Sequence, residues 1–462
     1  MKGAIEILVV GGGPAGSVAA VLLHRLGFQV RLIEASDQPR PHIGEAISLG
    51  VHRHLTNLGL GEALDRAGCR LFDEYDEQWE QAEASVRKAP PGSATIDRAR
   101  FDAAFWNLCR DAGVEVHLGQ QVERVVRQVS GGWNVRTVGG ERHDATFLID
   151  ATGRRSLLPR ARRACGPRTL ALYGYWRGEG LPVRPHIAAG ASCWTWGAPV
   201  DGLGFNAILF VDRHALAEHG PDVREAYTRG LAKTGLLSLL ASRSNCSVVS
   251  ACDASAWLDD EACGLDFIKI GEAAQSLDPL ASMGVQKAIQ SARSAAVIVN
   301  TLLRRPDAQS IAQAYYQDLL ERSAQVHRRA TAEIYARSRF AEMSFWQARC
   351  DGADAGIKMR EPASLSFSST ASVNLDMSRL GEHPCLCGDY VELRPAVLAG
   401  SEREPVAFLG DATVAGIVAA VRSSATWGAL RASLALTHDA TTADRICAWL
   451  VHNEILYVGA PG

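Results

Sequence analysis

Hydrophobic and polar positions near the N-terminus follow first a strand pattern and then a helical one. The apolar run Ile7–Val10 leads directly into Gly11-Gly12-Gly13-Pro14-Ala15-Gly16, and a helical pattern follows from Ser17 to Leu26. A second apolar run, Gln29 to Ile33, ends at Glu34. This succession of strand, helix and strand predicts a βαβ unit.

The glycine spacing of that unit suits a bound dinucleotide. In the pattern Gly11-x-Gly13-x-x-Gly16, the first glycine permits a tight turn, the second lets the backbone approach a pyrophosphate, and the third lets helix and strand pack closely. The helix start offers amide N–H groups to phosphate. Glu34 lies 18 residues after Gly16, about where an acid binds a ribose hydroxyl. We therefore expect an adenine dinucleotide to bind at six residues: Gly11, Gly13, Pro14, Ala15, Gly16 and Glu34.

Short strands and helices continue through the first 165 residues. The segment from Leu71 to Ile96 is acidic and irregular, which indicates either a solvated face or an excursion into a second sheet. A helix is expected to begin at Ile96-Asp97-Arg98. The strand expected after it is Val114–His117; Val122–Val129, Trp133–Val138 and Arg142–Ala145 are expected to form a β-meander, and Phe147–Asp150 a buried strand.

The remainder of the chain divides into three textures. Leu170–Asp260 is aromatic and glycine-rich, with a helix expected over Val223–Leu240, and is interpreted as a substrate-side sheet. Phe267–Ala274 repeats the strand-then-glycine pattern. Two long helices are expected over Val285–Leu303 and Ile311–Phe340. For the last ~115 residues we expect a hairpin across Val391–Leu409 and two short helices, Trp427–Leu436 and Thr442–Val451. Thr441 or Thr442 could cap the second of these helices.

Composition narrows the class of protein. The 462 residues are 47% hydrophobic and 21% charged, which is ordinary for a soluble chain with two or three domains. A net charge of −3 argues against a general nucleic-acid or anionic-membrane binder. Because no apolar run reaches the ~18 residues needed to span a bilayer, no leader precedes the first strand, and the eleven cysteines have no framework spacing, we expect a cytoplasmic protein with free thiols.

Three separated motifs together resemble the superfamily of flavoprotein monooxygenases and halogenases. They are the Gly11-x-Gly13-x-x-Gly16 unit, Asp150-Ala151-Thr152-Gly153, and Gly271-Glu272-Ala273-Ala274 followed by Asp278-Pro279-Leu280-Ala281-Ser282-Met283-Gly284-Val285. The resemblance covers residues 5 to 340 and implies the p-hydroxybenzoate hydroxylase fold with FAD bound along these motifs. It adds as cofactor-binding residues Arg98, Asp150, Gly153, Glu272, Pro279, Gly284 and Val285. Glu272 stands where the family usually has Asp, so its reach toward the ribityl chain is longer.

The resemblance implies an α/β fold with three parts. We expect a Rossmann-like, discontinuous FAD-binding domain over residues 1–70, 97–165 and 261–345. An interleaved mixed β-sheet substrate domain is expected over 71–96 and 166–260, and a small C-terminal α+β module over 346–462. That module weakly resembles a winged helix, but it lacks a basic cluster for DNA, so a peptide-recognition or lid role suits it better.

Two further motifs resemble the flavin-dependent halogenases within the superfamily. Gly44-Glu45-Ala46 matches a segment that these enzymes have beside the flavin, and Trp194-Thr195-Trp196-Gly197-Ala198-Pro199 matches their Trp-x-Trp-x-Ile-Pro motif, with Ala198 in place of Ile. In that subgroup a separate reductase supplies reduced FAD. The sequence shows no second glycine-rich dinucleotide unit, which is consistent with such a supply, although single-component hydroxylases also lack one.

The halogenation lysine is missing from its expected place. Halogenases need a lysine ahead of the Asp97-Arg98 helix, but this chain has six lysines and none between Lys2 and Lys88. Lys88 comes too late in the sequence. We therefore expect a monooxygenase that uses O2 through a flavin hydroperoxide. The alternatives are a halogenase with an unconventional cation, a reductase of prenyl chains similar to geranylgeranyl reductase, and a non-enzymatic flavin-binding scaffold.

Length, the halogenase-like motifs and the additional C-terminal region are most similar to the flavoproteins that hydroxylate a tryptophan during tryptophylquinone biogenesis. This implies a peptidyl tryptophan substrate, such as one in the small subunit of quinohemoprotein amine dehydrogenase, with no nucleic acid or membrane as partner. Glu45 is then the candidate catalytic base. His42 and His52 are interpreted as surface or packing residues, and His383-Pro384-Cys385-Leu386-Cys387 as a thiol-rich loop, so no metal site is expected.

Overall fold

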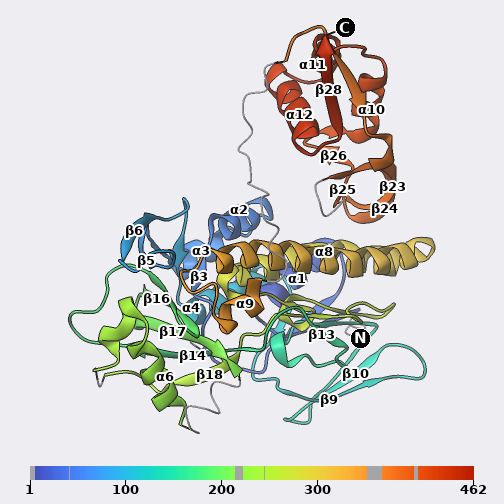
Figure 1. Cartoon of the computed structure of the whole chain (residues 1–462). Coiled ribbons are helices and arrows are strands. Elements are labelled where there is room, and N and C mark those ends of the chain that lie inside the picture. The colour runs from blue at the N-terminus through green and yellow to red at the C-terminus, as the bar shows by residue number, and fades with distance from the viewer. Residues whose placement is uncertain are drawn as a thin grey trace. The chain divides into compact units, whose positions relative to one another are not determined.

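The computed structural model describes six stretches of the chain: residues 6–40, 42–213, 222–243, 245–350, 367–399 and 404–461. The chain forms two compact units. The first comprises Met1–Asn300 and Ser323–Asp354, and the second comprises Thr301–Arg322 and Ala355–Gly462. Figure 1 shows the elements of both units, coloured from blue at the N-terminus to red at the C-terminus.

A parallel five-stranded sheet carries the predicted dinucleotide unit. Its strand order is β20 (Phe267–Lys269), β12 (Phe147–Asp150), β1 (Ile7–Val10), β2 (Val30–Ile33) and β8 (Glu115–His117). Helix α1 (Pro14–Arg25) connects β1 to β2, and the side chains of β1 are all buried. The βαβ unit and the α/β fold class are therefore confirmed. Because all neighbours run parallel, the glycine turn, Glu34, Ala151 and Ile270 follow strands that end at one edge of the sheet.

Smaller elements cover this sheet. The predicted meander is confirmed as β9 (Val122–Arg127), β10 (Trp133–Thr137) and β11 (Arg142–Ala145). Helix α4 (Arg98–Asp111) begins where Asp97 caps its first turn by accepting from Ala99 N. The other short elements are α2 (Leu49–Asn57), α3 (Glu62–Ala67), the sheet of β3 (Ala46–Ile47), β7 (Ala94–Thr95) and β4 (Arg70–Leu71), and the sheet of β13 (Arg162–Ala164), β19 (Trp257–Asp259) and β21 (Gln275–Ser276).

A seven-stranded sheet forms the rest of the first unit. Its order is β18 (Ser250–Asp253), β14 (Thr169–Trp176), β17 (Gly204–Asp212), β16 (Cys193–Val200), β15 (His186–Gly190), β5 (Glu74–Gln78) and β6 (Ser85–Lys88). The acidic segment therefore makes the excursion into a second sheet, because β5 pairs with β15. The helix expected over Val223–Leu240 is in fact α6 (Val223–Ala232) followed by a 3-10 helix, Gly235–Leu240, and both pack on one face of the sheet.

Long helices follow the sheets. Helices α7 (Gly284–Arg304) and α8 (Gln309–Ala336) match the two predicted long helices, except that α8 ends four residues earlier than expected. Beyond Ala336, Arg339 N donates to Trp79 O at 3.0 Å, and α9 (Ser344–Cys350) follows. Within the described stretches, none of these helices combines the length and apolar character that crossing a bilayer requires.

The second unit has its own core. Strand β22 (Ala371–Leu375) pairs with β28 (Leu456–Pro461), and β23 (Leu380–Cys387), β24 (Tyr390–Ala399) and β25 (Glu404–Val406) form a second sheet. The short pair β26 (Phe408–Leu409) and β27 (Ala412–Thr413) precedes helices α10 (Val414–Arg422), α11 (Trp427–Ala435) and α12 (Ala440–His452). The end of α7 belongs to this unit, where Thr301 Oγ1 accepts from Val391 N at 2.9 Å.

Two expectations for this unit are wrong. The thiol-rich stretch His383–Cys387 is part of strand β23 rather than a loop. Pro384 is tolerated because β23 lies at the edge of its sheet, where a missing N–H breaks no inner ladder. The cap of α12 is Asp439, whose carboxylate accepts from Thr442 N, rather than Thr441 or Thr442.

Candidate active site

The glycines of the turn after β1 have two different roles, because two of them are required for close packing and one borders open space. At Gly11, where φ is +110°, an added Cβ would lie 2.4 Å from Ala151 O, and at Gly16 it would lie 1.9 Å from Gly11 O. Both positions therefore require glycine for close packing. At Gly13, by contrast, an added Cβ would meet nothing within 4 Å. Open space thus lies beside the one glycine that was expected to let a pyrophosphate approach.

Glu34 ties the end of β2 to this turn. Its Oε2 accepts from Gly12 N at 2.7 Å and its Oε1 accepts from Ser36 N at 3.0 Å. Sequence reasoning missed a second anchor, since Trp106 of α4 donates from Nε1 to Gly12 O at 2.7 Å. No spacing rule connects a tryptophan to a turn 94 residues earlier in the chain.

Asp150 and Gly153 have different roles in the second motif. The fully buried Asp150 carboxylate accepts hydrogen bonds from Thr152, Ser156, Leu157 and Leu158, so protein donors already occupy it. We therefore expect Asp150 to act on a cofactor indirectly, by shaping the turn. Gly153, with φ of +68°, faces open space as Gly13 does.

The third motif continues along the same edge. An added Cβ at Gly271 would lie 2.9 Å from Ala15 Cβ, so this turn packs against the start of α1. Glu272 is 45% exposed and forms an ion pair with Arg154 at 3.0 Å. Glu272 and Arg154 thus meet where the second and third motifs come together.

The loop from Asp278 to Gly284 leads from this edge into α7. Asp278 accepts from Leu280 N at 2.9 Å and so caps the short 3-10 turn Pro279–Ala281. Gly284 faces open space, and the side chain of Val285 is buried in the first turn of α7. Gly13, Gly153 and Gly284 therefore each border open space, which fits the extended FAD molecule expected along the three motifs.

Arg98 is engaged by protein groups. Its guanidinium contacts Asp102 Oδ1 at 3.2 Å and donates to Ile43 O at 3.4 Å. His42 Nε2 lies 3.1 Å from the other Asp102 oxygen. Burial alone would raise the pKa of Asp102, but Arg98 and His42 hold that pKa below its ordinary value. This ion-pair group fixes the segment that leads into Gly44 and Glu45.

Glu45 is held on both carboxylate oxygens by the seven-stranded sheet. It is 5% exposed; Tyr175 of β14 donates to Oε1 at 2.5 Å and the Asn206 amide of β17 donates to Oε2. Burial raises the pKa of Glu45 to about 7, although the two hydrogen bonds and the charge of Arg98 oppose this shift. Asp97 raises that pKa further. A carboxyl group with this pKa changes protonation state near neutral pH, as a general base requires.

Aromatic side chains cover the sheet face beside Glu45. Trp194 stacks on Phe210 with ring centroids 3.8 Å apart and meets Trp79 edge-on at 6.2 Å. Ile43 and Leu280 pack into the same cluster, so the Glu45 segment and the Asp278–Gly284 loop both border it. The other members beside these include Tyr173, Ile187, Trp196, Tyr335, Phe340, Phe345 and Trp346. Trp194, Phe210 and Trp346 are at most 4% exposed, so these side chains form a packed core beside Glu45.

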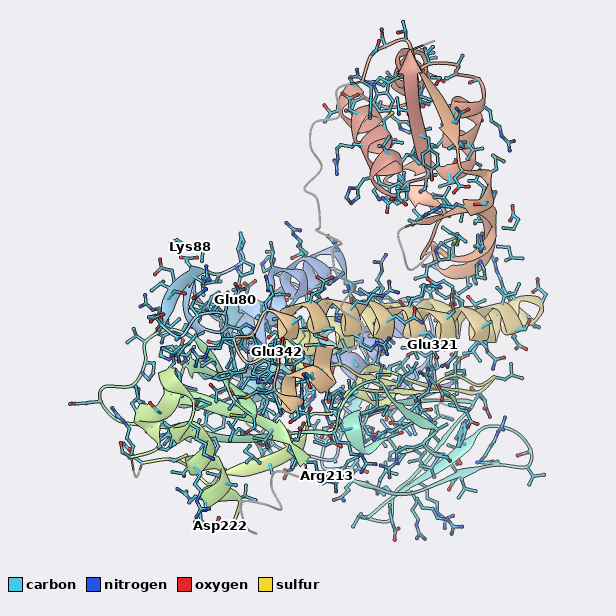
Figure 2. All side chains as sticks on the ribbon, viewed as in Figure 1. Glu80, Lys88, Arg213, Asp222, Glu321 and Glu342 are labelled. Atoms are coloured by element: carbon cyan, nitrogen blue, oxygen red, sulfur yellow. The ribbon has the colours of Figure 1, made fainter. Side chains whose placement is uncertain are left out.

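The four lysines among the described residues lie away from Glu45 and contact other groups. Lys88 is 81% exposed and pairs with Glu74 on the hairpin β5–β6, at whose rim Figure 2 labels it. Lys269 is buried against Asp259 at 2.7 Å, Lys287 lies in α7 near His54 and His327, and Lys233 follows α6. The charged groups that dominate the Glu45 environment are Arg98 and Asp97.

A hydroxyl-deleted variant tests the environment of Glu45. Because the Tyr175 hydroxyl lowers the pKa of Glu45, Tyr175→Phe is expected to raise that pKa above about 7. If Glu45 acts as a base, the acidic limb of the pH–rate profile moves to higher pH. The plateau rate at high pH should then fall less than the rates measured on the acidic limb. An acidic limb that stays at the same pH would show that Tyr175 does not affect the pKa of the titrating group.

Comparison with known proteins supports an FAD-dependent enzyme. Residues 6–165 match the family described as FAD dependent oxidoreductase. The tryptophan 2-halogenase of Chondromyces crocatus is 29% identical over 373 residues, which span 74% of this chain and 70% of that protein. The flavin-dependent halogenase armH3 of Armillaria mellea is 27% identical, over 81% of this chain and 83% of that protein.

Two solved structures share the fold over nearly the whole chain. One is "Peptidyl tryptophan dihydroxylase QhpG essential for tryptophylquinone cofactor biogenesis", with a TM-score of 0.76, 24% identity, and coverage of 98% of this chain and 100% of that one. The other is the flavin-dependent halogenase CmlS, with a TM-score of 0.78, 21% identity, and coverage of 99% and 96%. At these identities the similarity establishes the fold.

Proposed function

We propose that the chain is an FAD-dependent oxidoreductase that hydroxylates an aromatic ring, the indole of a tryptophan within a polypeptide. The observation that carries the proposal is the Glu45 carboxyl group, which is buried beside an aromatic cluster and whose pKa is raised to about 7. The fold shared with a peptidyl tryptophan dihydroxylase supports the choice of substrate class.

The cofactor would be held by the residues that border the open space. Gly11 and Gly16 shape the turn, Gly13 admits the pyrophosphate, and Glu34 lies where the ribose is expected. Glu272, Pro279, Gly284 and Val285 belong to the later segments along the same edge, and Arg98 lies beside the Gly44 segment. Reduced FAD supplies two electrons, so that one atom of O2 enters the substrate ring and the other leaves as water.

The residues of the chain do the rest. Tyr173 and Trp196, the partly buried rings at the border of the aromatic cluster, would orient the indole, and the ring loses a proton from the carbon that gains oxygen. Glu45, ionised above about pH 7, accepts that proton, while Tyr175 and Asn206 keep its carboxylate in place. The partner we propose is a precursor polypeptide of a tryptophylquinone enzyme, such as the small subunit of quinohemoprotein amine dehydrogenase.

The test is the mass of candidate substrates after incubation with the protein, reduced FAD and oxygen. The expected result is the addition of oxygen to a tryptophan of the partner polypeptide. The sequence relatives favour halogenation as the second candidate, because those named above are halogenases. A chloride-dependent gain of one chlorine and no oxygen would establish that candidate instead.

Electron supply gives a second expectation. The chain shows one glycine-rich dinucleotide unit, and we assign it to FAD. The purified protein should therefore oxidise NAD(P)H slowly on its own, yet turn over when a separate reductase or a chemical reductant supplies reduced FAD. Stopped-flow absorbance of the flavin measures both rates, and rapid reduction by NADPH alone would contradict this assignment.

A further inference from the structure

A buried tyrosine connects the Asp278–Gly284 loop to the body of the first unit. Tyr335 of α8 is 1% exposed and donates from its hydroxyl to Asp278 Oδ1 at 2.9 Å. The same oxygen accepts from Leu280 N and thereby caps the turn Pro279–Ala281. The loop also holds Ser282 at φ of +49°, a left-handed conformation that a non-glycine residue keeps only where its surroundings impose it.

Neighbouring groups keep the Tyr335 ring in place. Trp79 and Trp346 lie 6.4 Å and 5.9 Å from the ring centroid, and the Arg349 guanidinium carbon lies 5.9 Å away. Arg349 is itself held by Asp212 at 2.7 Å and Thr169 at 2.8 Å, both on the seven-stranded sheet. Burial raises the pKa of Tyr335 well above its ordinary value, so the hydroxyl remains a neutral donor.

We propose that Tyr335 is a positioning residue, which holds Asp278 and so sets the Asp278–Gly284 loop against bound FAD. The inference rests on the proposed placement of the flavin beside this loop. The substitution that tests it is Tyr335→Phe, which removes the hydroxyl and keeps the ring.

Tyr227 provides a matched control in the same unit. It is also fully buried, donates to Ala207 O at 2.8 Å and accepts from Trp176 Nε1 at 3.1 Å. Its contacts lie on the opposite side of the sheet from the aromatic cluster, in the core with α6. Tyr335→Phe and Tyr227→Phe therefore each lose one buried hydroxyl that donates to an acceptor oxygen.

The measurements are the melting temperature without FAD, the FAD dissociation constant from flavin fluorescence, and the visible spectrum of bound FAD. Both variants should lower the melting temperature, but only Tyr335→Phe should raise the FAD dissociation constant, by about tenfold, and shift the flavin band. A Tyr335→Phe protein with wild-type affinity and spectrum overturns the proposal. None of these readouts requires product formation, so a failure of the proposed hydroxylation is seen separately.

Discussion

Gly13→Val is expected to weaken FAD binding strongly while leaving the protein folded. Gly13 has an ordinary negative φ of −71°, and an added Cβ would meet nothing within 4 Å. The valine side chain would therefore fit the apoprotein and fill the space that the pyrophosphate needs. Losing two or three charge-assisted backbone hydrogen bonds, each worth about 1.5–3 kcal/mol, raises the FAD dissociation constant by about 10²-fold or more.

Two matched variants separate binding from folding. Gly13→Ala adds only the Cβ and should weaken FAD binding less than valine does. Gly16→Val places a Cβ 1.9 Å from Gly11 O, so it should lower the melting temperature before any ligand is added. Flavin titration and thermal melts of the three apoproteins give the comparison. Normal flavin occupancy in a folded Gly13→Val protein would show that the site is misplaced.

Periodic patterns predicted the parts of the fold that depend on local sequence. The βαβ unit is marked by apolar runs on either side of a glycine motif and a helical pattern. The meander and the long helices repeat apolar positions at intervals of two or 3.6 residues, and all these elements are present. The acidic segment from Leu71 to Ile96 had two interpretations because β6 is exposed along its length, and an exposed strand carries no alternation. Strand β23 was also hard to recognise from sequence, because it contains Pro384 and proline is found in strands only at the edge of a sheet.

The candidate site was predictable where a motif carries it and unpredictable where contacts are distant in sequence. The glycines and Glu45 follow short motifs. The partners of Glu45 lie 130 and 161 residues away, and Tyr335 lies 57 residues from Asp278. No single-sequence pattern brings such pairs together, because their proximity depends on how the sheets and helices pack. The protein partners of Asp150 and Arg98 were unpredictable for the same reason, since folding brings them together.

Glu45→Gln is expected to remove most hydroxylation while retaining FAD and substrate binding. Glutamine has nearly the same shape, but its amide accepts no proton at neutral pH. Its new NH2 group can be accommodated, because Asn206 Oδ1 has no partner among the described residues and the Asn206 amide can turn to accept from it. Tyr175 can still donate to the remaining oxygen. Removing one general base typically costs ~10²–10⁴-fold in rate.

The pH dependence identifies the base independently of the rate. Since burial raises the pKa of Glu45 to about 7, the wild-type rate should be constant above that pH and fall about tenfold per pH unit below it. Glu45→Gln should lose this acidic limb along with the activity. Glu80→Gln, an exposed substitution on the β5–β6 hairpin that Figure 2 labels, should keep both. The assay is single-turnover oxygen incorporation into the tryptophan of a partner polypeptide, measured by mass. An unimpaired Glu45→Gln protein contradicts the role of the base, and efficient hydroxylation of free tryptophan contradicts the polypeptide substrate.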